Sequence, residues 1–300
     1  RYDRDLKHIF ATQDEITLKI INALQVKLTE GEKARVTGKG TKNLDAYLKA
    51  MQAQEQMRGT HNKENSLKVR QLAMEAISLD PRYGYPYAIL SGSHLKDKWL
   101  PSTESPEESM RLASEAAQKA LALDDSDYRI HIILGFLFIN QGNYDKAVAA
   151  AQRAVELCPG GADAYKVLGT ALDFACRTSQ AIPMFEKAIK LNPLPDPTLP
   201  YLLAAAYQWV GRYEDAIIEG KKALQLNPNN ALTHFVLVRA YANLGRKEAA
   251  RTQAAEVLRI NPKFSLDWYL KTAIKMMATE CHSKFYDEIE FVRKADVGLK

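Results

Sequence analysis

A short apolar-x-proline phrase returns at a nearly constant interval along the second half of this chain. Its prolines follow one another at spacings of 34, 35 and 34 residues: Pro159, Pro193, Pro228 and Pro262. A series of alanines repeats the same three spacings: Ala147, Ala181, Ala216 and Ala250. Self-similarity at this period predicts stacked copies of one supersecondary unit, because a unit of about 34 residues cannot bury its apolar face alone.

Within each copy the residue types predict two helices joined by a tight turn. Alanines recur where the two helices must cross closely, and larger apolar residues fill the space between neighbouring copies. Gly142 and Gly211 stand where the first helix should end in a left-handed conformation. Cys176 occupies the same position in the intervening copy, so this turn is either strained by about 1 kcal/mol or built differently. The proline then ends the second helix, because it lacks an amide hydrogen.

The interval and these residue types resemble the tetratricopeptide repeat over roughly residues 44–296. The resemblance implies an all-α fold, an α-solenoid wound as a right-handed superhelix of about six helix pairs. We predict the repeat array over residues 44–264, with a first, degenerate pair at 44–57 and 67–79. A capping helix pair with a more polar second helix is predicted over residues 265–300.

The periodicity has one irregularity and one boundary. Pro81 and Asp125 occupy equivalent positions but lie 44 residues apart, which places an insert of ten residues at about 96–105. The insert ends at Ser105-Pro106-Glu107-Glu108, a capping box that predicts the start of the next helix. Residues 1–43 lie before the array, and they predict an amphipathic helix beginning near Gln13 followed by a glycine- and lysine-containing linker.

Composition narrows the classes of function. The formal net charge of +5 is spread along the chain, whereas a nucleic-acid-binding protein would show a clustered basic face. The longest apolar run, residues 130–139, is about ten residues long and too short to span a membrane. Cys158, Cys176 and Cys281 are far apart in sequence and are predicted to be reduced thiols, as is typical of a cytoplasmic protein. The chain opens on Arg1, and we interpret it as a fragment of a longer protein.

Several short motifs favour structural over chemical roles. "TGKGTK" at residues 37–42 lacks the spacing of a phosphate loop and predicts a flexible linker. "DDSD" at residues 124–127 lacks the glycine and terminal glutamate of a calcium loop, so a helix-capping turn is favoured. His131 and His234 occupy an aromatic position of the repeat, which predicts packing. Cys281-His282 has no second pair at metal spacing. No catalytic residue, metal or cofactor is predicted, and we expect a non-enzymatic protein.

The repeat family implies which side chains line the concave face of the solenoid, and those side chains are apolar and aromatic with two cations. Such a groove suits an extended or helical peptide, although some of these rings could equally pack between helices. The lysine and asparagine that form a carboxylate clamp for chaperone tails are replaced by Ile132 and Phe136 in the leading unit, and Lys166 with Thr170 match only half of the clamp, so we predict no chaperone-tail receptor. Trp99, in the insert, is a separate candidate contact that could equally fold back onto the solenoid. The predicted groove residues are Ile132, Phe136, Ile139, Lys166, Thr170, Asp173, Tyr201, Gln208, Trp209, Phe235, Arg239 and Asn243.

A narrower resemblance rests on "RYDRDLKHIFATQDEITLKIINALQVKL", "YLKAMQAQEQM" and "AAEVLRINPKFSL". These phrases resemble the C-terminal part of bacterial multidomain proteins in which a cyclase domain precedes a TolB-like segment and tetratricopeptide repeats; similar tails also follow winged-helix regulators. The resemblance implies a protein- or peptide-binding arm that regulates or scaffolds an attached signalling domain. Two alternatives remain: a self-association module that dimerises through the N-terminal helix, and a small-ligand sensor or enzyme with a site near the insert.

Overall fold

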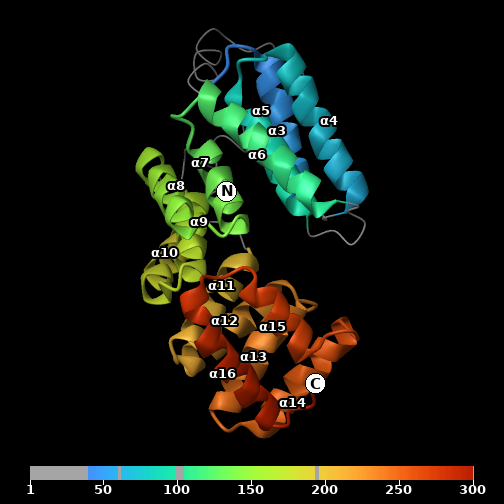
Figure 1. The fold of residues 1–300 in the computed structure, drawn as a ribbon, viewed down its shortest axis with the longest axis vertical. Coiled ribbons are helices and arrows are strands. Elements are labelled where there is room, and N and C mark those ends of the chain that lie inside the picture. Colours follow the sequence, from blue (N-terminus) through green and yellow to red (C-terminus); the bar gives the residue numbers. More distant parts are fainter. Residues whose placement is uncertain (1–39, 60–61, 99–104, 193–195, 300) are drawn as a thin grey trace, which may run out of the picture. The chain divides into compact units, whose positions relative to one another are not determined.

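The computed structural model describes residues 40–59, 62–98, 105–192 and 196–299, and these residues form α-helices without a strand (Figure 1). The expected amphipathic helix lies outside the described residues, as does the linker that follows it except for residues 40–43; Trp99 lies outside them as well. The helices are α3 (Leu44–Arg58), α4 (Lys63–Leu79), α5 (Gly84–Asp97), α6 (Pro106–Leu123), α7 (Tyr128–Asn140), α8 (Tyr144–Leu157), α9 (Ala162–Phe174), α10 (Thr178–Leu191), α11 (Thr198–Trp209), α12 (Tyr213–Leu226), α13 (Ala231–Asn243), α14 (Lys247–Ile260), α15 (Leu266–Ile274) and α16 (His282–Lys294), with a short 3-10 turn, η2 (Thr279–Cys281).

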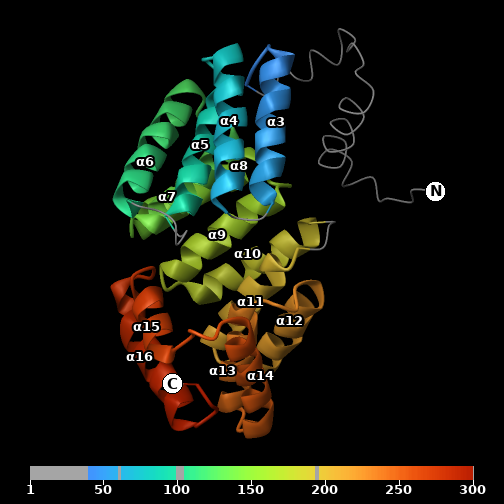
Figure 2. The same cartoon turned by 90° about the vertical axis from the view of Figure 1, so that its right-hand side faces the viewer.

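The chain divides into two compact units. The N-terminal unit contains the described residues up to Leu137 together with Glu156–Cys158, and the C-terminal unit contains Phe138–Val155 and the residues from Pro159 onward. In the N-terminal unit, helices α3 to α6 pack side by side in chain order (Figure 2). The predicted capping box is confirmed at the start of α6, where the Ser105 hydroxyl accepts a hydrogen bond from the Glu108 amide at 3.1 Å.

In the C-terminal unit, each first helix packs against its own second helix and against the next pair. The closest pairings along the chain are α9 with α10, α11 with α12 and α13 with α14. The alanines of the 34-residue series Ala147, Ala181, Ala216 and Ala250 are all fully buried. Their small side chains allow the close helix crossings that the periodicity predicted. Gly169 is used in the same way, since an added Cβ would lie 2.6 Å from the Phe185 ring.

The turns inside the repeats show why glycine recurs at one position. Gly142, Gly211 and Gly245 have φ values of 71°, 79° and 69°, which glycine adopts without steric cost. Cys176 has a φ of 62° at the equivalent position. Of the two alternatives for this turn, the strained one is therefore correct, at a cost of about 1–2 kcal/mol for a residue that carries a Cβ.

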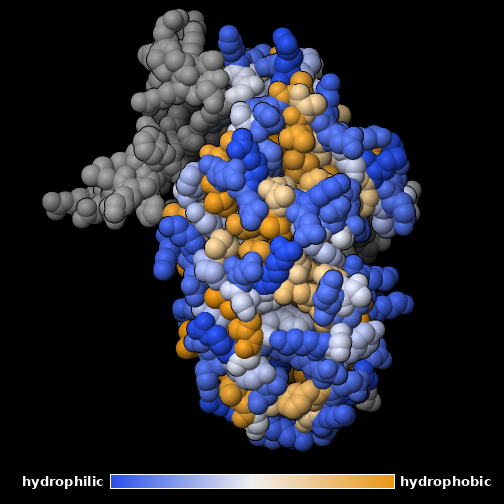
Figure 3. Space-filling view, turned by 60° about the vertical axis from the view of Figure 1, so that its left-hand side comes forward, coloured by the Kyte–Doolittle hydropathy of each residue, from blue (hydrophilic) through white to orange (hydrophobic). Residues whose placement is uncertain are grey.

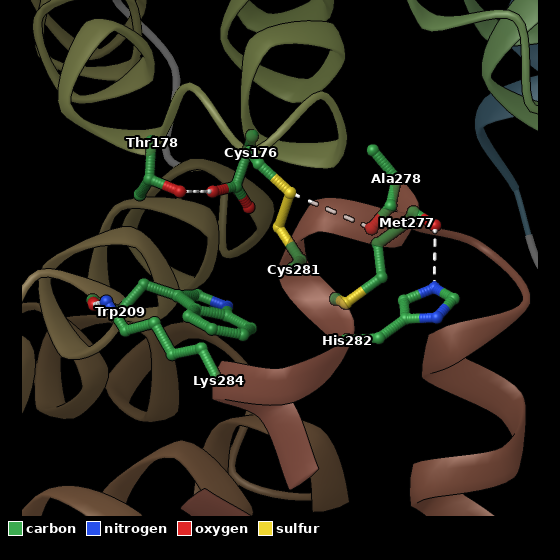
Figure 4. Close-up of a disulfide and its surroundings, with 9 residues drawn as sticks. Cys176, Thr178, Trp209, Met277, Ala278, Cys281, His282 and Lys284 are labelled. Carbon is green, nitrogen blue, oxygen red and sulfur yellow. Dashed lines mark hydrogen bonds between the residues drawn. A yellow bond between two sulfur atoms is a disulfide. The ribbon is translucent and has the colours of Figure 1, made fainter. Parts of the chain in front are cut away.

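Two of the three cysteines are bonded to each other. Cys176 and Cys281 form a disulfide across a sequence separation of 105 residues, with a Cα–Cα distance of 5.8 Å (Figure 4). That distance lies within the usual range for a disulfide. The expectation of three reduced thiols is therefore wrong for this pair, because sequence separation says nothing about proximity in a stacked repeat; Cys158 is not disulfide-bonded.

The surface of the described residues is mixed in polarity. In Figure 3, polar residues predominate on the displayed face and apolar residues are interspersed among them. Among the large apolar side chains that are more than half exposed, Leu67, Met74 and Ile218 lie on second helices of the pairs, and Trp268 lies on the first helix α15. Within the described part of the chain, no helix combines the length and apolar character that crossing a bilayer requires.

Candidate functional site

The predicted groove residues divide between the two units. Ile132 and Phe136 lie on α7 in the N-terminal unit, and the other ten belong to the C-terminal unit. Ile139 is buried, and Lys166 forms an ion pair with Asp163 on its own helix at 2.6 Å.

Arg239 lies at the centre of an aromatic cluster built by three successive first helices, counting α15. Its side chain is 2% exposed, and its guanidinium carbon lies 5.8 Å from the ring centroids of both Trp209 on α11 and Phe235 on α13. Phe235 is fully buried and packs against Tyr269 of α15, with ring centroids 4.6 Å apart. Two aromatic rings thus flank a cation that is almost completely removed from water, a favourable cation–π arrangement.

The charge of Arg239 is balanced by Glu288 of the C-terminal helix α16. The Arg239 Nε donates to Glu288 Oε1 at 3.1 Å, and a second hydrogen bond joins Arg239 Nη2 to Glu288 Oε2. Burial alone would lower the pKa of Arg239, but the Glu288 carboxylate raises it above its ordinary value. The pair is bidentate and its carboxylate side chain is 14% exposed, so the cation keeps its charge inside the groove.

An aromatic residue of the same helix completes the cluster. The Phe285 ring stacks on Trp209 with centroids 5.4 Å apart and an interplanar angle of 24°. It also lies 5.6 Å from the guanidinium carbon of Arg239 and 5.7 Å from the Tyr269 ring. Phe285 is 1% exposed. Helix α16 therefore inserts an aromatic side chain and a carboxylate between the side chains that were predicted to receive a ligand.

The segment that precedes α16 is attached to the end of α9. The Ala278 amide donates to the Phe174 carbonyl at 2.9 Å, and Cys281 is disulfide-bonded to Cys176 in the turn after α9. The Lys284 ammonium then donates to the Trp209 carbonyl at 2.6 Å, as Figure 4 shows. Residues 278–288 thus contact α9, α11 and α13 in succession, which are the helices expected to line the concave face.

Asp173, at the end of α9, adds a carboxylate to the same region. The Thr178 hydroxyl donates to Asp173 Oδ1 at 2.8 Å. Burial raises the pKa of Asp173 to about 6, although Thr178 and the positive charge of Arg239 each lower it. Burial likewise raises the pKa of Tyr201 and of Tyr269, and Arg239 opposes both shifts. Asp173 and Tyr201 are thus within the electrostatic reach of the Arg239 cluster.

Three other predicted groove residues have hydrogen bonds within their own helix or none among the described residues. Thr170 donates to the Lys166 carbonyl at 2.8 Å and Asn243 donates to the Arg239 carbonyl at 2.9 Å, so both bind within their own helices. Gln208, beside Trp209, is 2% exposed, and both of its amide atoms lack a hydrogen-bond partner among the described residues. Burying an unsatisfied polar group costs about 1–3 kcal/mol, so Gln208 is a position that a further polar group could stabilise.

The structure assigns structural roles to the motifs that resembled chemical sites. His131 and His234 are buried, and each places a ring nitrogen within 3.0 Å of a backbone carbonyl in the preceding turn. In the "DDSD" turn, Asp124 accepts a hydrogen bond from the Ser126 amide at 2.9 Å, as a capping turn requires. Among the described residues, no group of histidine, cysteine or acidic side chains is arranged to hold a metal ion.

Three residues that occupy the groove, in α16 or directly before it, were not predicted from the sequence: Cys281, Phe285 and Glu288. Two signals for them were present. The first is a cysteine at a turn position that favours glycine, which destabilises the turn unless another interaction compensates. The second is the spacing of four and three residues between Phe285, Ile289 and Val292. This spacing gives α16 one apolar face, and all three side chains are buried.

Comparison with known proteins agrees with the fold. Models of the tetratricopeptide repeat match residues 128–160 and 231–264. A structure of Pseudomonas aeruginosa pilF aligns over 81% of this chain and 97% of its own, with a TM-score of 0.56 and 18% identity. The Cut9 and Hcn1 hetero-tetramer of the APC/C aligns over 97% of this chain and 54% of the matched chain, with a TM-score of 0.66 and 18% identity. At these identities the two structures are similar in fold alone.

A curated bacterial protein is similar in sequence. "Putative adenylate cyclase 3" of Rhizobium meliloti is 35% identical over 153 residues, which is 49% of this chain. The match spans 25% of that protein's length.

Proposed function

We propose that this all-α chain, which contains tetratricopeptide repeats and resembles part of a putative adenylate cyclase, binds a peptide or protein segment in the groove of its C-terminal unit. Repeats of this kind form protein-interaction scaffolds. One observation supports this groove: Trp209 and Arg239 come from successive repeats and already hold helix α16, Trp209 by ring stacking and Arg239 by a bidentate ion pair. Aromatic and arginine side chains are the usual anchors of protein interfaces.

The chemistry of the groove defines what it can bind. Trp209 and Phe235 supply apolar contact area, Arg239 supplies a fixed positive charge, and Gln208 supplies an amide that no described residue uses. A segment that carries an aromatic side chain and a carboxylate satisfies the first two features. We therefore propose an amphipathic acidic helix as the ligand class, bound in the helix-in-groove mode.

The role within a longer protein is the finer part of the proposal. The region shared with the named adenylate cyclase lies in a protein about four times the length of the match, since the match covers 25% of it. We propose that the repeats serve as a regulatory or scaffolding arm of a signalling protein. In such a chain, occupancy of the groove would be transmitted to the neighbouring domain, and cyclic-nucleotide output measured with and without a groove ligand would test it.

Selection of displayed peptides on the whole chain tests the binding function. A random peptide library is selected on the wild-type protein, both with and without a dithiol reductant. Enriched peptides should bind Trp209→Ala and Arg239→Met variants at least about tenfold more weakly, which corresponds to loss of one interface anchor. Ile218→Ala, an exposed position on α12, is the matched control and should bind normally. Peptides that bind all of these folded variants equally in both conditions would contradict the groove as the binding site.

A further inference from the structure

Residues 278–299 have the properties of a ligand supplied by the chain itself. They contact three first helices through separate interactions: a backbone hydrogen bond to Phe174, a hydrogen bond and ring stacking at Trp209, and the ion pair at Arg239. These are the same helices that line the predicted binding face. The groove of the C-terminal unit is therefore occupied in this structure, and an outside ligand has to replace its occupant.

The occupant also shows which chemistry the groove selects. Phe285 and Glu288 lie three residues apart on one face of α16, so that the ring reaches Trp209 while the carboxylate reaches Arg239. Ile289 and Val292 continue the buried face, whereas Tyr286, Glu290 and Lys294 are exposed. The recognised pattern is an aromatic residue followed three positions later by an acid, on a helix with one apolar face.

The disulfide holds this occupant at its N-terminal end. Cys281 is the last residue of η2 and directly precedes α16, and its partner Cys176 stands in the turn that follows α9. Cys176 takes up a left-handed conformation that Gly142, Gly211 and Gly245 adopt in the equivalent turns. A cysteine is thus placed at a backbone position that suits glycine, at the point where a bond to Cys281 fastens α16 over the groove.

We propose that residues 278–299 are a removable cover of the groove, fastened by the Cys176–Cys281 disulfide, and that reduction admits a partner helix with the aromatic-x-x-acid pattern of Phe285 and Glu288. This inference rests on the proposed function, because it concerns the regulation and ligand of the same groove. In a reducing compartment, disulfides of this kind are transient and serve as redox sensors.

The redox step is a thiol–disulfide exchange with a dithiol reductant. One thiolate of the reductant attacks a sulfur of the Cys176–Cys281 bond, forming a mixed disulfide and releasing the other cysteine as a thiolate. The second thiol of the reductant then displaces the remaining cysteine. Two electrons and two protons pass to Cys176 and Cys281, which become thiols, while the reductant becomes a disulfide.

Hydrogen exchange on the whole chain tests the release of the cover. In wild-type protein treated with a dithiol, amides of α16 should exchange at least about tenfold faster than in the oxidised protein, while amides of α13 should keep their protection. Cys281→Ser should exchange rapidly in both conditions. Cys158→Ser is the matched control and should respond to the dithiol as the wild type does. Equal protection of α16 in both redox states would show that the disulfide does not control release of the cover.

Binding of a defined peptide tests the ligand class. The probe is a fluorescein-labelled peptide with the sequence of residues 282–297, followed by fluorescence anisotropy. It should bind the reduced wild type at least about tenfold more tightly than the oxidised protein, and the reduced Phe285→Ala variant more tightly still, because the competing cover is weakened. Peptides that carry the Phe285→Ala or Glu288→Gln change should bind about tenfold more weakly.

The outcomes separate the cover from the binding function. If the peptide binds reduced Phe285→Ala but binds the wild type equally in both redox states, the disulfide does not control the cover. The proposed binding function of the groove would still hold. If the peptide binds none of the folded variants, the proposed ligand class is wrong. The library selection then tests the binding function independently. A dimer that forms on reduction, detected by light scattering, would show that a second copy supplies α16 and would overturn the partner helix.

Discussion

The guanidinium of Arg239 and the carboxylate of Glu288 form a bidentate ion pair across 49 residues of sequence, inside a ring of aromatic side chains. Its position explains why the C-terminal helix stays in the groove. A buried cation is stable only beside a counter-charge, and Glu288 provides that charge from α16.

Removal of the carboxylate should be costly. We expect Glu288→Gln to lower the free energy of unfolding of the C-terminal unit by about 3 kcal/mol, because it leaves the Arg239 charge buried without its partner. Glu214→Gln removes a comparable pair, Glu214 with Arg246, whose side chains are 58% and 50% exposed. That control should cost less than about 1 kcal/mol in urea unfolding. Equal losses for the two variants would contradict the importance of the buried pair.

Substitution of Cys176 by glycine should have opposite effects in the two redox states. Under a dithiol, Cys176→Gly should stabilise the chain by about 1 kcal/mol, since glycine adopts a φ of 62° without a Cβ clash. Without reductant it should destabilise the chain by about 2–4 kcal/mol, because the disulfide is lost. Cys281→Ser loses the disulfide but keeps the strained turn, so it should show only the destabilisation. Thermal unfolding with and without dithiol measures both effects.

The pKa of Asp173 predicts a defined pH dependence. An unfolded aspartate titrates near 3.8, whereas burial raises the folded value to about 6, so the folded state binds more protons between these values. The free energy of unfolding should therefore decrease as pH rises from about 4 to about 6 and level off above that. Relative to Asp173→Asn, the wild type should lose on the order of 1–3 kcal/mol across this range. Asp145→Asn, at a side chain that is 87% exposed, should leave the slope unchanged.

A methyl group at Gly169 should disturb the α9–α10 packing. Its Cβ would lie 2.6 Å from Cε1 of Phe185, a fully buried ring. We expect Gly169→Ala to destabilise the C-terminal unit by about 1–3 kcal/mol, as overpacked cores do. Gly160→Ala is the control, since nothing lies within 4 Å of the added Cβ. Chemical denaturation followed by circular dichroism measures the difference.

The repeat period predicted the helices well, for a physical reason. Each pair is a local unit whose start and end are marked by its own residues, such as the Ser105 capping box and the left-handed Gly142 and Gly211. Most of these helix ends could therefore be predicted from the sequence of a single copy of the repeat. The expected domain boundaries at residues 43 and 264, by contrast, stay predictions.

The occupation of the groove by α16 could not be predicted from the sequence in the same way. Its decisive contacts, Cys176 with Cys281 and Arg239 with Glu288, join residues 105 and 49 positions apart, and no local pattern specifies such pairs. The predicted groove residues did include Trp209, Phe235 and Arg239, which lie in one cluster, while their assignment to the concave face stays a prediction. The segment that occupies this face is set by tertiary contacts with α16, which the repeat period does not specify.

The burial of Arg239 has a kinetic consequence. If α16 left before a new segment arrived, Arg239 would remain beside Trp209 and Phe235 without its carboxylate, which makes the vacant groove a costly intermediate. This intermediate is rarely populated, so the departure of α16 sets the upper limit on the rate at which a ligand binds. The observed association rate should reach a plateau as ligand concentration increases. The time constant of binding is then set by the departure of α16 and not by the properties of the partner.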